Sequence, residues 1–284
     1  MDKTPLSPKN DFVFKLLFGE RSRLNLLGSF LQSVLDLPKE EYQRLAIVDP
    51  FLKREHYDDK LGVLDVKIHT PGGRIIDVEI QVEAQADMWE RILYYATRMT
   101  TEQLRSGQAY EAIKKVVSII ILDWPLIGPE SAAYHHCFRL FDERTGYRFP
   151  DLFEINTLEL PKLPRRPDGT ALYNWLKFFT AKTEEELTMV AETSPEIAQA
   201  VGIIMELSED EQTRLLAESR EKYRRDEYSR RKLARQEGLQ KGREEGLLIA
   251  AKNLLRLKIA PELIAESTGL SLEEIRALAE KLQP

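Results

Sequence analysis

Residues 61–82, LGVLDVKIHTPGGRIIDVEIQV, restrict the possible folds more than any other stretch of the chain. Val, Ile and Leu alternate with polar residues on both sides of Pro71-Gly72-Gly73, which is typical of a β-hairpin with a tight turn. Even-numbered positions are apolar on both arms, from Leu64 to Val82. We therefore expect the even-numbered side chains to face a core and the odd-numbered ones to share the opposite face.

The register of this hairpin brings two carboxylates together. The apolar sets coincide only if opposing residue numbers have an even sum, because a slip of one residue turns a strand over. A three-residue loop at 71–73 meets this condition and pairs Asp65 with Glu79, Lys67 with Asp77, and Val63 with Gln81. Acidic residues are depleted in strands, and like charges directly opposite each other are destabilising.

Two interpretations of the facing carboxylates are open. A divalent cation would turn the repulsion into coordination, because Mg²⁺ binds through one or two carboxylates together with water and substrate oxygens. Alternatively, the odd-numbered face is simply hydrated, and Lys67 reduces its charge.

The elements around the hairpin predict an α/β core. Helical spacing runs from residue 8 to 37 with a break near Gly19, and a strand follows at 44–52. After the hairpin, residues 86–107 read as a helix that buries Trp89, Leu93 and their neighbours and ends at Gly107. Residues 114–124 are an apolar, β-branched run that suits a buried strand. Further short strands are expected between 134 and 160.

The C-terminal half is predicted to be helical. Residues 161–169, PKLPRRPDG, read as a linker. Arginine and lysine dominate residues 220–235, and glycines then recur at 238, 242 and 246. The last residues read as two short helices joined at 268–270, and Ser271 with Glu274 forms a capping box at the start of the second.

Composition excludes several classes of protein. The formal net charge of −6 excludes a uniformly basic nucleic-acid coat. The chain has neither an apolar run of the about 20 residues that span a bilayer nor the N-terminal apolar segment of a secretory signal. The single cysteine, Cys137, excludes an internal disulfide framework. Cytoplasmic residence is therefore expected.

Several segments, in this order, resemble the recombination-promoting nuclease (Rpn) and transposase family of the PD-(D/E)XK nuclease superfamily. They cover nearly the whole chain: KNDFVFKLLFG, VLDVKIHTPGGRIIDVEIQV, RILYYATRMTTEQLRSGQAY, VVSIIILDW, LELPKL, and the glycine-spaced tail that ends in STGLSLEEI. The resemblance implies an α/β fold whose PD-(D/E)XK-like core runs helix, three-strand antiparallel meander, helix, strand, followed by a helical C-terminal region. We divide the chain into a nuclease-like domain (1–165), a helical region with the basic segment (166–236) and a glycine-spaced tail with the terminal helical hairpin (237–284).

The resemblance also implies an activity and a site. It implies a Mg²⁺-dependent DNA endonuclease, working with Mg²⁺ or another divalent cation, that promotes DNA recombination or mobile-element movement. Asp65 and Glu79 would hold the metal, with the carbonyl of Ile80 as a third ligand. Gln81 stands where the superfamily usually has a lysine, and a glutamine can orient water or phosphate but supplies no positive charge.

Four further residues are accessory candidates, each with a plainer alternative. Asp11 is a metal ligand, or an acid favoured by the dipole of its helix. Lys67 supplies the missing charge, or pairs with Asp77. Arg91 contacts phosphate, or is a surface arginine of its helix. Gln103 matches another polar position of the family.

The helical C-terminal half offers two interaction surfaces. Arg224, Arg225, Arg230 and Arg231 are candidates for binding the DNA backbone, although a charged helix face is often only solvated. The glycine spacing suggests close helix packing in a homo-oligomer, or a flexible tail. The rivals to the nuclease are therefore a catalytically weak or inactive DNA-associated protein acting through its basic helices, and a helical scaffold that binds no nucleic acid.

Overall fold

The computed structural model describes residues 4–35, 37–52 and 64–281. Residues up to Glu221 form one compact unit and those from Lys222 onward form a second. The first unit and the helix that leaves it contain these elements: α1 (Asp11–Phe18), α2 (Leu24–Val34), α3 (Lys39–Gln43), β1 (Ala46–Val48), β2 (Val66–His69), β3 (Ile75–Gln81), α4 (Met88–Thr101), β4 (Val116–Leu122), β5 (His135–Arg139), β6 (Phe153–Glu159), α5 (Ala171–Thr180), α6 (Glu184–Ala191), α7 (Pro195–Glu209) and α8 (Glu211–Arg256). The second unit ends with α9 (Pro261–Thr268) and α10 (Leu272–Lys281).

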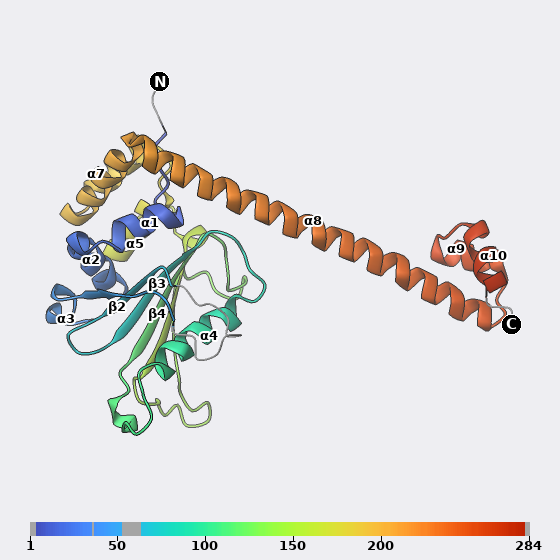
Figure 1. Cartoon of the computed structure of the whole chain (residues 1–284), viewed down its shortest axis with the longest axis horizontal. Helices are drawn as coiled ribbons and strands as arrows, with labels where there is room; N and C mark the ends of the chain where they lie inside the picture. Colours follow the sequence, from blue (N-terminus) through green and yellow to red (C-terminus); the bar gives the residue numbers. More distant parts are fainter. Residues whose placement is uncertain (1–3, 36, 53–63, 282–284) are drawn as a thin grey trace. The chain divides into compact units, whose positions relative to one another are not determined.

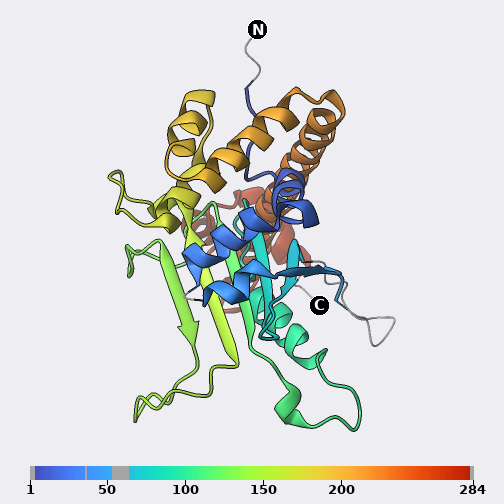
Figure 2. The same cartoon turned by 90° about the vertical axis from the view of Figure 1, so that its left-hand side faces the viewer.

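A six-stranded sheet in the order β1-β2-β3-β4-β6-β5 forms the centre of the first unit (Figures 1 and 2). β1, β2 and β3 form an antiparallel meander, while β3, β4 and β6 run parallel, as expected when a helix connects β3 to β4. The predicted α/β core is confirmed, although β1 occupies only the middle of the expected strand.

The predicted hairpin register is also confirmed. Lys67 pairs with Asp77 and Val66 with Val78. The loop of three residues closes through a hydrogen bond from the N–H of Gly73 to Thr70. Gly73 has φ +84°, a backbone conformation that favours glycine. The expected partner of Gln81, Val63, lies outside the described residues.

Helices α1, α2 and α5 lie on one side of the sheet (Figure 1). The even-numbered side chains of β2 and β3 share one buried core with these helices and with α6 and α7. The ring of Phe18 lies at its centre and contacts four other aromatic rings: Phe14, Phe30, Trp175 and Phe179. Two of those rings come from α5, beyond the predicted linker. The compact unit therefore continues past residue 165, and the three-part division of the chain stays a prediction.

Helix α4 covers the opposite face of the sheet, so the odd-numbered face of the hairpin is not the hydrated surface considered above. The predicted packing face of α4 is partly wrong. Trp89 and Leu93 are 42% and 53% exposed, whereas Met88, Tyr95 and Met99 are buried. α4 also ends at Thr101 rather than at Gly107. The face with Trp89 and Leu93 and the face with Met88, Tyr95 and Met99 both carry apolar residues. The periodicity of the sequence therefore could not decide which face packs on the sheet.

Leu64 is a second correction. It was expected on the core face with Val66, but it packs with Ile75 and Tyr95 on the α4 side. Regular alternation holds only inside a strand, and β2 begins at Val66.

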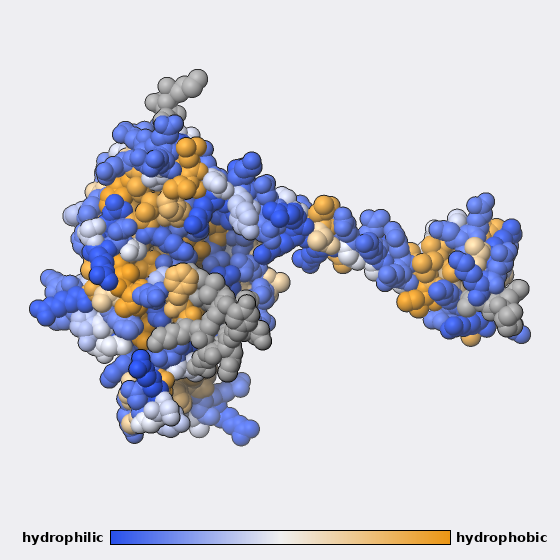
Figure 3. All heavy atoms as spheres, in the orientation of Figure 1, coloured by the Kyte–Doolittle hydropathy of each residue, from blue (hydrophilic) through white to orange (hydrophobic). Residues whose placement is uncertain are grey.

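The second unit contains α8 from Lys222 onward together with α9 and α10. Ala251, Ile264 and Ile275 form its small buried cluster, and hydrophobic residues gather over this end of the chain in Figure 3. Reciprocal hydrogen bonds between Ser271 and Glu274 confirm the predicted capping box. No helix in the described part of the chain combines the length and apolarity needed to cross a membrane.

Candidate active site

The candidate site lies where β2 begins and β3 ends, between α1 and α4. Asp65 directly precedes β2, and its Oδ2 accepts a hydrogen bond of 3.1 Å from the N–H of Ile80, the residue after Glu79. The backbone pairing of β2 with β3 starts at Val66. Just before this point, the carboxylate of Asp65 rather than a backbone carbonyl accepts the N–H of Ile80. Asp65 and Glu79 are thus neighbours, as the hairpin register predicts.

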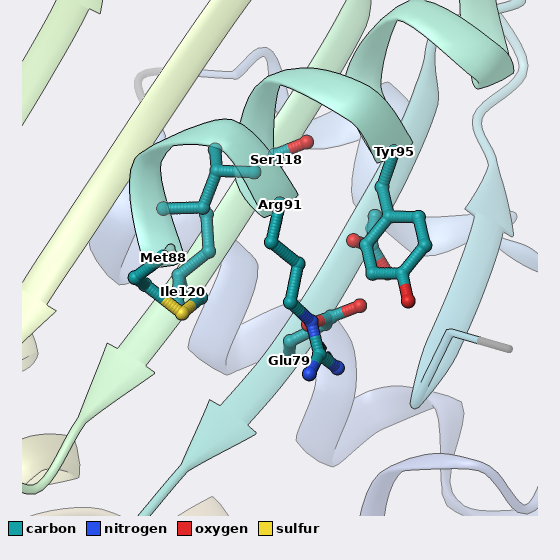
Figure 4. Close-up of a pocket in the computed structure, with 8 residues that line it drawn as sticks. Glu79, Met88, Arg91, Tyr95, Ser118 and Ile120 are labelled. Atoms are coloured by element: carbon teal, nitrogen blue, oxygen red, sulfur yellow. Dashed lines mark ion pairs between the residues drawn. The ribbon is translucent and has the colours of Figure 1, made fainter. Parts of the chain in front are cut away.

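Glu79 points toward α4 and is only 3% exposed. Its Oε2 lies 4.0 Å from Nη2 of Arg91 (Figure 4). The same oxygen accepts a hydrogen bond of 3.3 Å from Nε2 of Gln81, while Oε1 is buried without a hydrogen-bond partner. Burial, and then the charge of Asp65, raise the pKa of Glu79 to about 7, although Arg91 and Gln81 oppose the rise. A buried carboxylate with one free oxygen is suited to accept a cation.

Glu79, Gln81, Gln85 and Arg91 form a closed ring of polar contacts. Oε1 of Gln81 accepts from Nε2 of Gln85 at 3.3 Å, and Oε1 of Gln85 accepts from Nη1 of Arg91 at 3.1 Å. Nη2 of Arg91 lies 4.0 Å from Oε2 of Glu79, which closes the ring of contacts. The Cζ atom of Arg91 lies 5.3 Å from the ring centre of Tyr95. The ring directs the amide NH₂ of Gln81 at the carboxylate of Glu79. It also turns Arg91 inward, so Arg91 is not the plain surface arginine of the alternative above.

Asp77 lies deeper under α4 than Glu79 on the same face of β3. Burial, followed by the charges of Glu79 and Asp65, raises the pKa of Asp77 well above its ordinary value. Its Oδ1 and the hydroxyl of Ser118 have no hydrogen-bond partner, and both residues line a cavity of about 10 Å³, close to the smallest space that holds one water. This environment favours the neutral form of Asp77.

Lys67 is set opposite Asp77 by the register, but its ammonium is directed at α4. Its Nζ lies 3.5 Å from Oε2 of Glu102. The salt-bridge partner of Lys67 is therefore Glu102, whereas the sequence alternative paired it with Asp77. Lys67 still lowers the pKa of Asp77, against the larger effect of burial.

Helix α1 brings a cation to the site. Nζ of Lys15 lies 3.0 Å from Oδ1 of Asp65. Asp11, one turn earlier on the same helix, instead pairs with Arg220 at 3.1 Å. Sequence reasoning chose Asp11 and missed Lys15, although the spacing of four residues that places them on one helix face was available.

The remaining predicted residues make other contacts. Both side-chain amide atoms of Gln103 bind the backbone of Lys114, which fixes the connection from α4 to β4. The candidate DNA-binding arginines belong to α8 in the second unit. Arg230 and Arg231 each pair with Glu227, and Arg225 is exposed.

Residues 8–234 match the sequence profile described as PD-(D/E)XK nuclease family transposase. The chain belongs to this family. As a member of the PD-(D/E)XK nuclease family transposases, it is assigned a nuclease- or transposase-like role. No curated protein and no solved structure matches it. The family assignment agrees with the resemblance found in the sequence segments and with the observed sheet and flanking helices.

The donors present in this family member fit a hard divalent cation. Glu79 offers its unpartnered Oε1. The N–H of Ile80 points to Asp65, and the carbonyl of an extended residue points to the same side as its N–H, so the carbonyl of Ile80 is directed to the side of Asp65. Within the described residues no three His, Cys, Asp or Glu side chains form a metal cluster. Two carboxylates and a carbonyl are an all-oxygen set of the kind that suits Mg²⁺, which keeps several waters.

Proposed function

We propose that this protein is a Mg²⁺-dependent DNA endonuclease that hydrolyses phosphodiester bonds. The observation that carries the proposal is the juxtaposition of Asp65 with Glu79 through the N–H of Ile80, in a chain that belongs to a nuclease family. Asp65 and Glu79 would hold the ion together with the carbonyl of Ile80. When bound, Mg²⁺ would withdraw charge from the phosphoryl oxygen and from the attacking water.

The residues of the chain have separate tasks in this reaction. Gln81 and Arg91 orient the carboxylate of Glu79 and favour its ionised form. Helix α4 excludes water from the inner side of the carboxylate. In the hydrolysis, the oxygen of a water forms a bond to phosphorus, and the bond from phosphorus to the leaving sugar oxygen breaks. The water gives a proton to solvent and the leaving oxygen takes one from solvent.

Nicking of supercoiled plasmid tests the proposal. The parent should nick in MgCl₂ and not in excess chelator, and Asp65→Asn and Glu79→Gln should each abolish nicking. Asp87→Asn is the matched control, because Asp87 is exposed and makes no side-chain cap to α4. Parental nicking by both site variants would overturn the site assignment.

A DNA-associated protein with weak or absent catalysis is the second candidate. The observation in its favour is that the amide of Gln81 is already engaged by Glu79 and Gln85, so no base is supplied there. In that case DNA binding depends on α8. Replacing Arg225, Arg230 and Arg231 by glutamine should then weaken binding and reduce its salt dependence, by about 0.9 in the log–log slope for each lost phosphate contact. Replacing exposed Lys252 is the control.

Self-association through the C-terminal helices is part of the proposal. A Cβ added at Gly238, Gly242 or Gly246 would meet no atom within 4 Å, so these positions can accept a second helix. Light scattering should show a mass above that of the monomer, and Gly242→Leu should lower it. We also propose that the cuts serve DNA recombination or mobile-element movement, which transposition of a marked element in cells would test.

A further inference from the structure

Gln81 stands where the superfamily usually has a lysine, and one residue of α1 is placed to supply the positive charge. We infer that Lys15 is the phosphate-facing cation of this site, from a helix rather than from the position of Gln81. The inference rests on the proposed function. It assigns to Lys15 the positive charge that stabilises the phosphate as negative charge develops on it.

The ammonium of Lys15 contacts Asp65 and is partly exposed to solvent. Its Nζ lies 3.0 Å from Oδ1 of Asp65, and its side chain is 37% exposed. The other oxygen of Asp65 is held by the N–H of Ile80. Asp65 is therefore bound from the strand on one side and from α1 on the other. Because the side chain of Lys15 is 37% exposed and that of Asp65 is 14% exposed, a polyanion can reach this ammonium from solvent.

The backbone of α1 is firmly placed, so the position of Lys15 is not accidental. Val13, Phe14, Leu17 and Phe18 are buried in the main core. The side chain of Asn10 accepts hydrogen bonds from two N–H groups of the first turn and donates one to the carbonyl of Ala217. With four of its eight residues buried and its N-terminus capped, α1 holds residue 15 at the edge of the site.

Three other cations of the described chain already have partners of their own. Arg91 lies on the inner side, against Gln85, Glu79 and the ring of Tyr95. Lys67 pairs with Glu102 under α4. Lys9 pairs with Asp123 at 2.6 Å. Among the described residues, the ion pair with Asp65 belongs to Lys15.

Lys15 has two separable effects in this arrangement. Its charge competes with a metal ion for Asp65, because both are attracted to the same carboxylate. Its charge also attracts the phosphate and stabilises the transition state. Removing the charge should therefore strengthen metal binding and weaken catalysis, whereas a residue that only builds the site would weaken both.

The test compares Lys15→Met, Lys15→Arg and the control Lys177→Met, whose lysine is exposed on α5. Calorimetry with Mn²⁺ in the absence of DNA should show about fivefold tighter binding to Lys15→Met. This is the factor that corresponds to the attraction between two unit charges about 4 Å apart in water, here the ammonium of Lys15 and the carboxylate of Asp65, which the ion must displace in the parent. Plasmid nicking at saturating Mg²⁺ should fall by about 10²-fold in Lys15→Met, and Lys15→Arg should restore most of it. Thermal unfolding checks that all variants fold.

Two results would overturn the inference: nicking by Lys15→Met at the parental rate, or weaker Mn²⁺ binding by that variant. If the parent nicks no DNA with any metal, the proposed function fails, and binding of duplex DNA in Ca²⁺ then decides the role of Lys15. Lys15→Met should bind that DNA about tenfold more weakly than Lys177→Met, as a lost charge-assisted contact implies. Equal affinities would refute the assignment.

Discussion

Glu79→Gln should stabilise the metal-free protein at neutral and alkaline pH, although it removes a side chain of the site. The pKa of Glu79 is raised from its ordinary value of 4.5 to about 7, first by burial and then by Asp65. Such a group contributes stability that is complete below the unfolded-state pKa and is lost as pH rises through the folded-state pKa. The stability that neutral Glu79 contributes is therefore lost between pH 4.5 and about 7.

The size of the effect follows from the same pKa. A rise from 4.5 to about 7 corresponds to about 3 kcal/mol, at about 1.4 kcal/mol for each pKa unit. The coupling to Asp77 acts in the same direction, because the charge of Glu79 raises the pKa of Asp77 and its removal makes Asp77 easier to ionise in the folded protein. Metal-free Glu79→Gln should thus be about 3 kcal/mol or more above the parent in stability at pH 8, with the gain shrinking toward zero at pH 4.5.

Urea unfolding at pH 4.5, 6 and 8 in chelator measures this difference. Glu111→Gln is the control, because Glu111 is exposed, and it should follow the parent at every pH. Added Mg²⁺ should stabilise the parent and leave Glu79→Gln unchanged, since binding to the folded state alone raises stability. A variant that is less stable than the parent at pH 8, or a difference that does not change with pH, would refute the reasoning.

Three further outcomes are expected. Burial disfavours the charge of Glu154, but its hydrogen bonds, including one from Lys115, lower its pKa to about 2. Glu154→Gln should therefore lose stability at pH 7, and urea unfolding should show the loss disappearing as pH falls from about 4.5 to 2. Phe18→Ala should cost about 3–5 kcal/mol in the same assay, because the ring is buried among aromatic neighbours. Gln85→Leu frees the amide of Gln81, so plasmid nicking should slow by about 10-fold or more while the fold survives; unchanged nicking would show that the polar ring is dispensable.

The hairpin was predictable from the sequence because its period of two and its turn act locally. The even-numbered residues fix which face is buried, and three residues between the arms fix the register that pairs Lys67 with Asp77. The neighbourhood of Asp65 and Glu79 follows from that register alone. The parallel order of β3, β4 and β6 was less accessible, because pairing between strands distant in the sequence leaves no local pattern.

The other parts of the site could not be predicted because they come from elements that dock at long range. Lys15 reaches Asp65 only after α1 packs on the sheet through Phe14 and Phe18. Gln85 lies in the loop before α4, where no periodicity indicates its direction. The linker at 161–169 is polar and rich in proline, but composition does not reveal that the following helix returns to the same core.

Calorimetric titration of Mn²⁺ into the chelator-treated protein tests most directly whether Asp65 and Glu79 share one divalent ion. The parent should bind one ion, with an affinity that falls about tenfold for each pH unit below the pKa of Glu79, about 7, because the carboxylate must lose its proton to bind. Asp65→Asn and Glu79→Gln should each remove this binding, while Asp87→Asn should retain it. Unchanged binding by either site variant, or no binding by the parent at pH 8, would contradict the shared site.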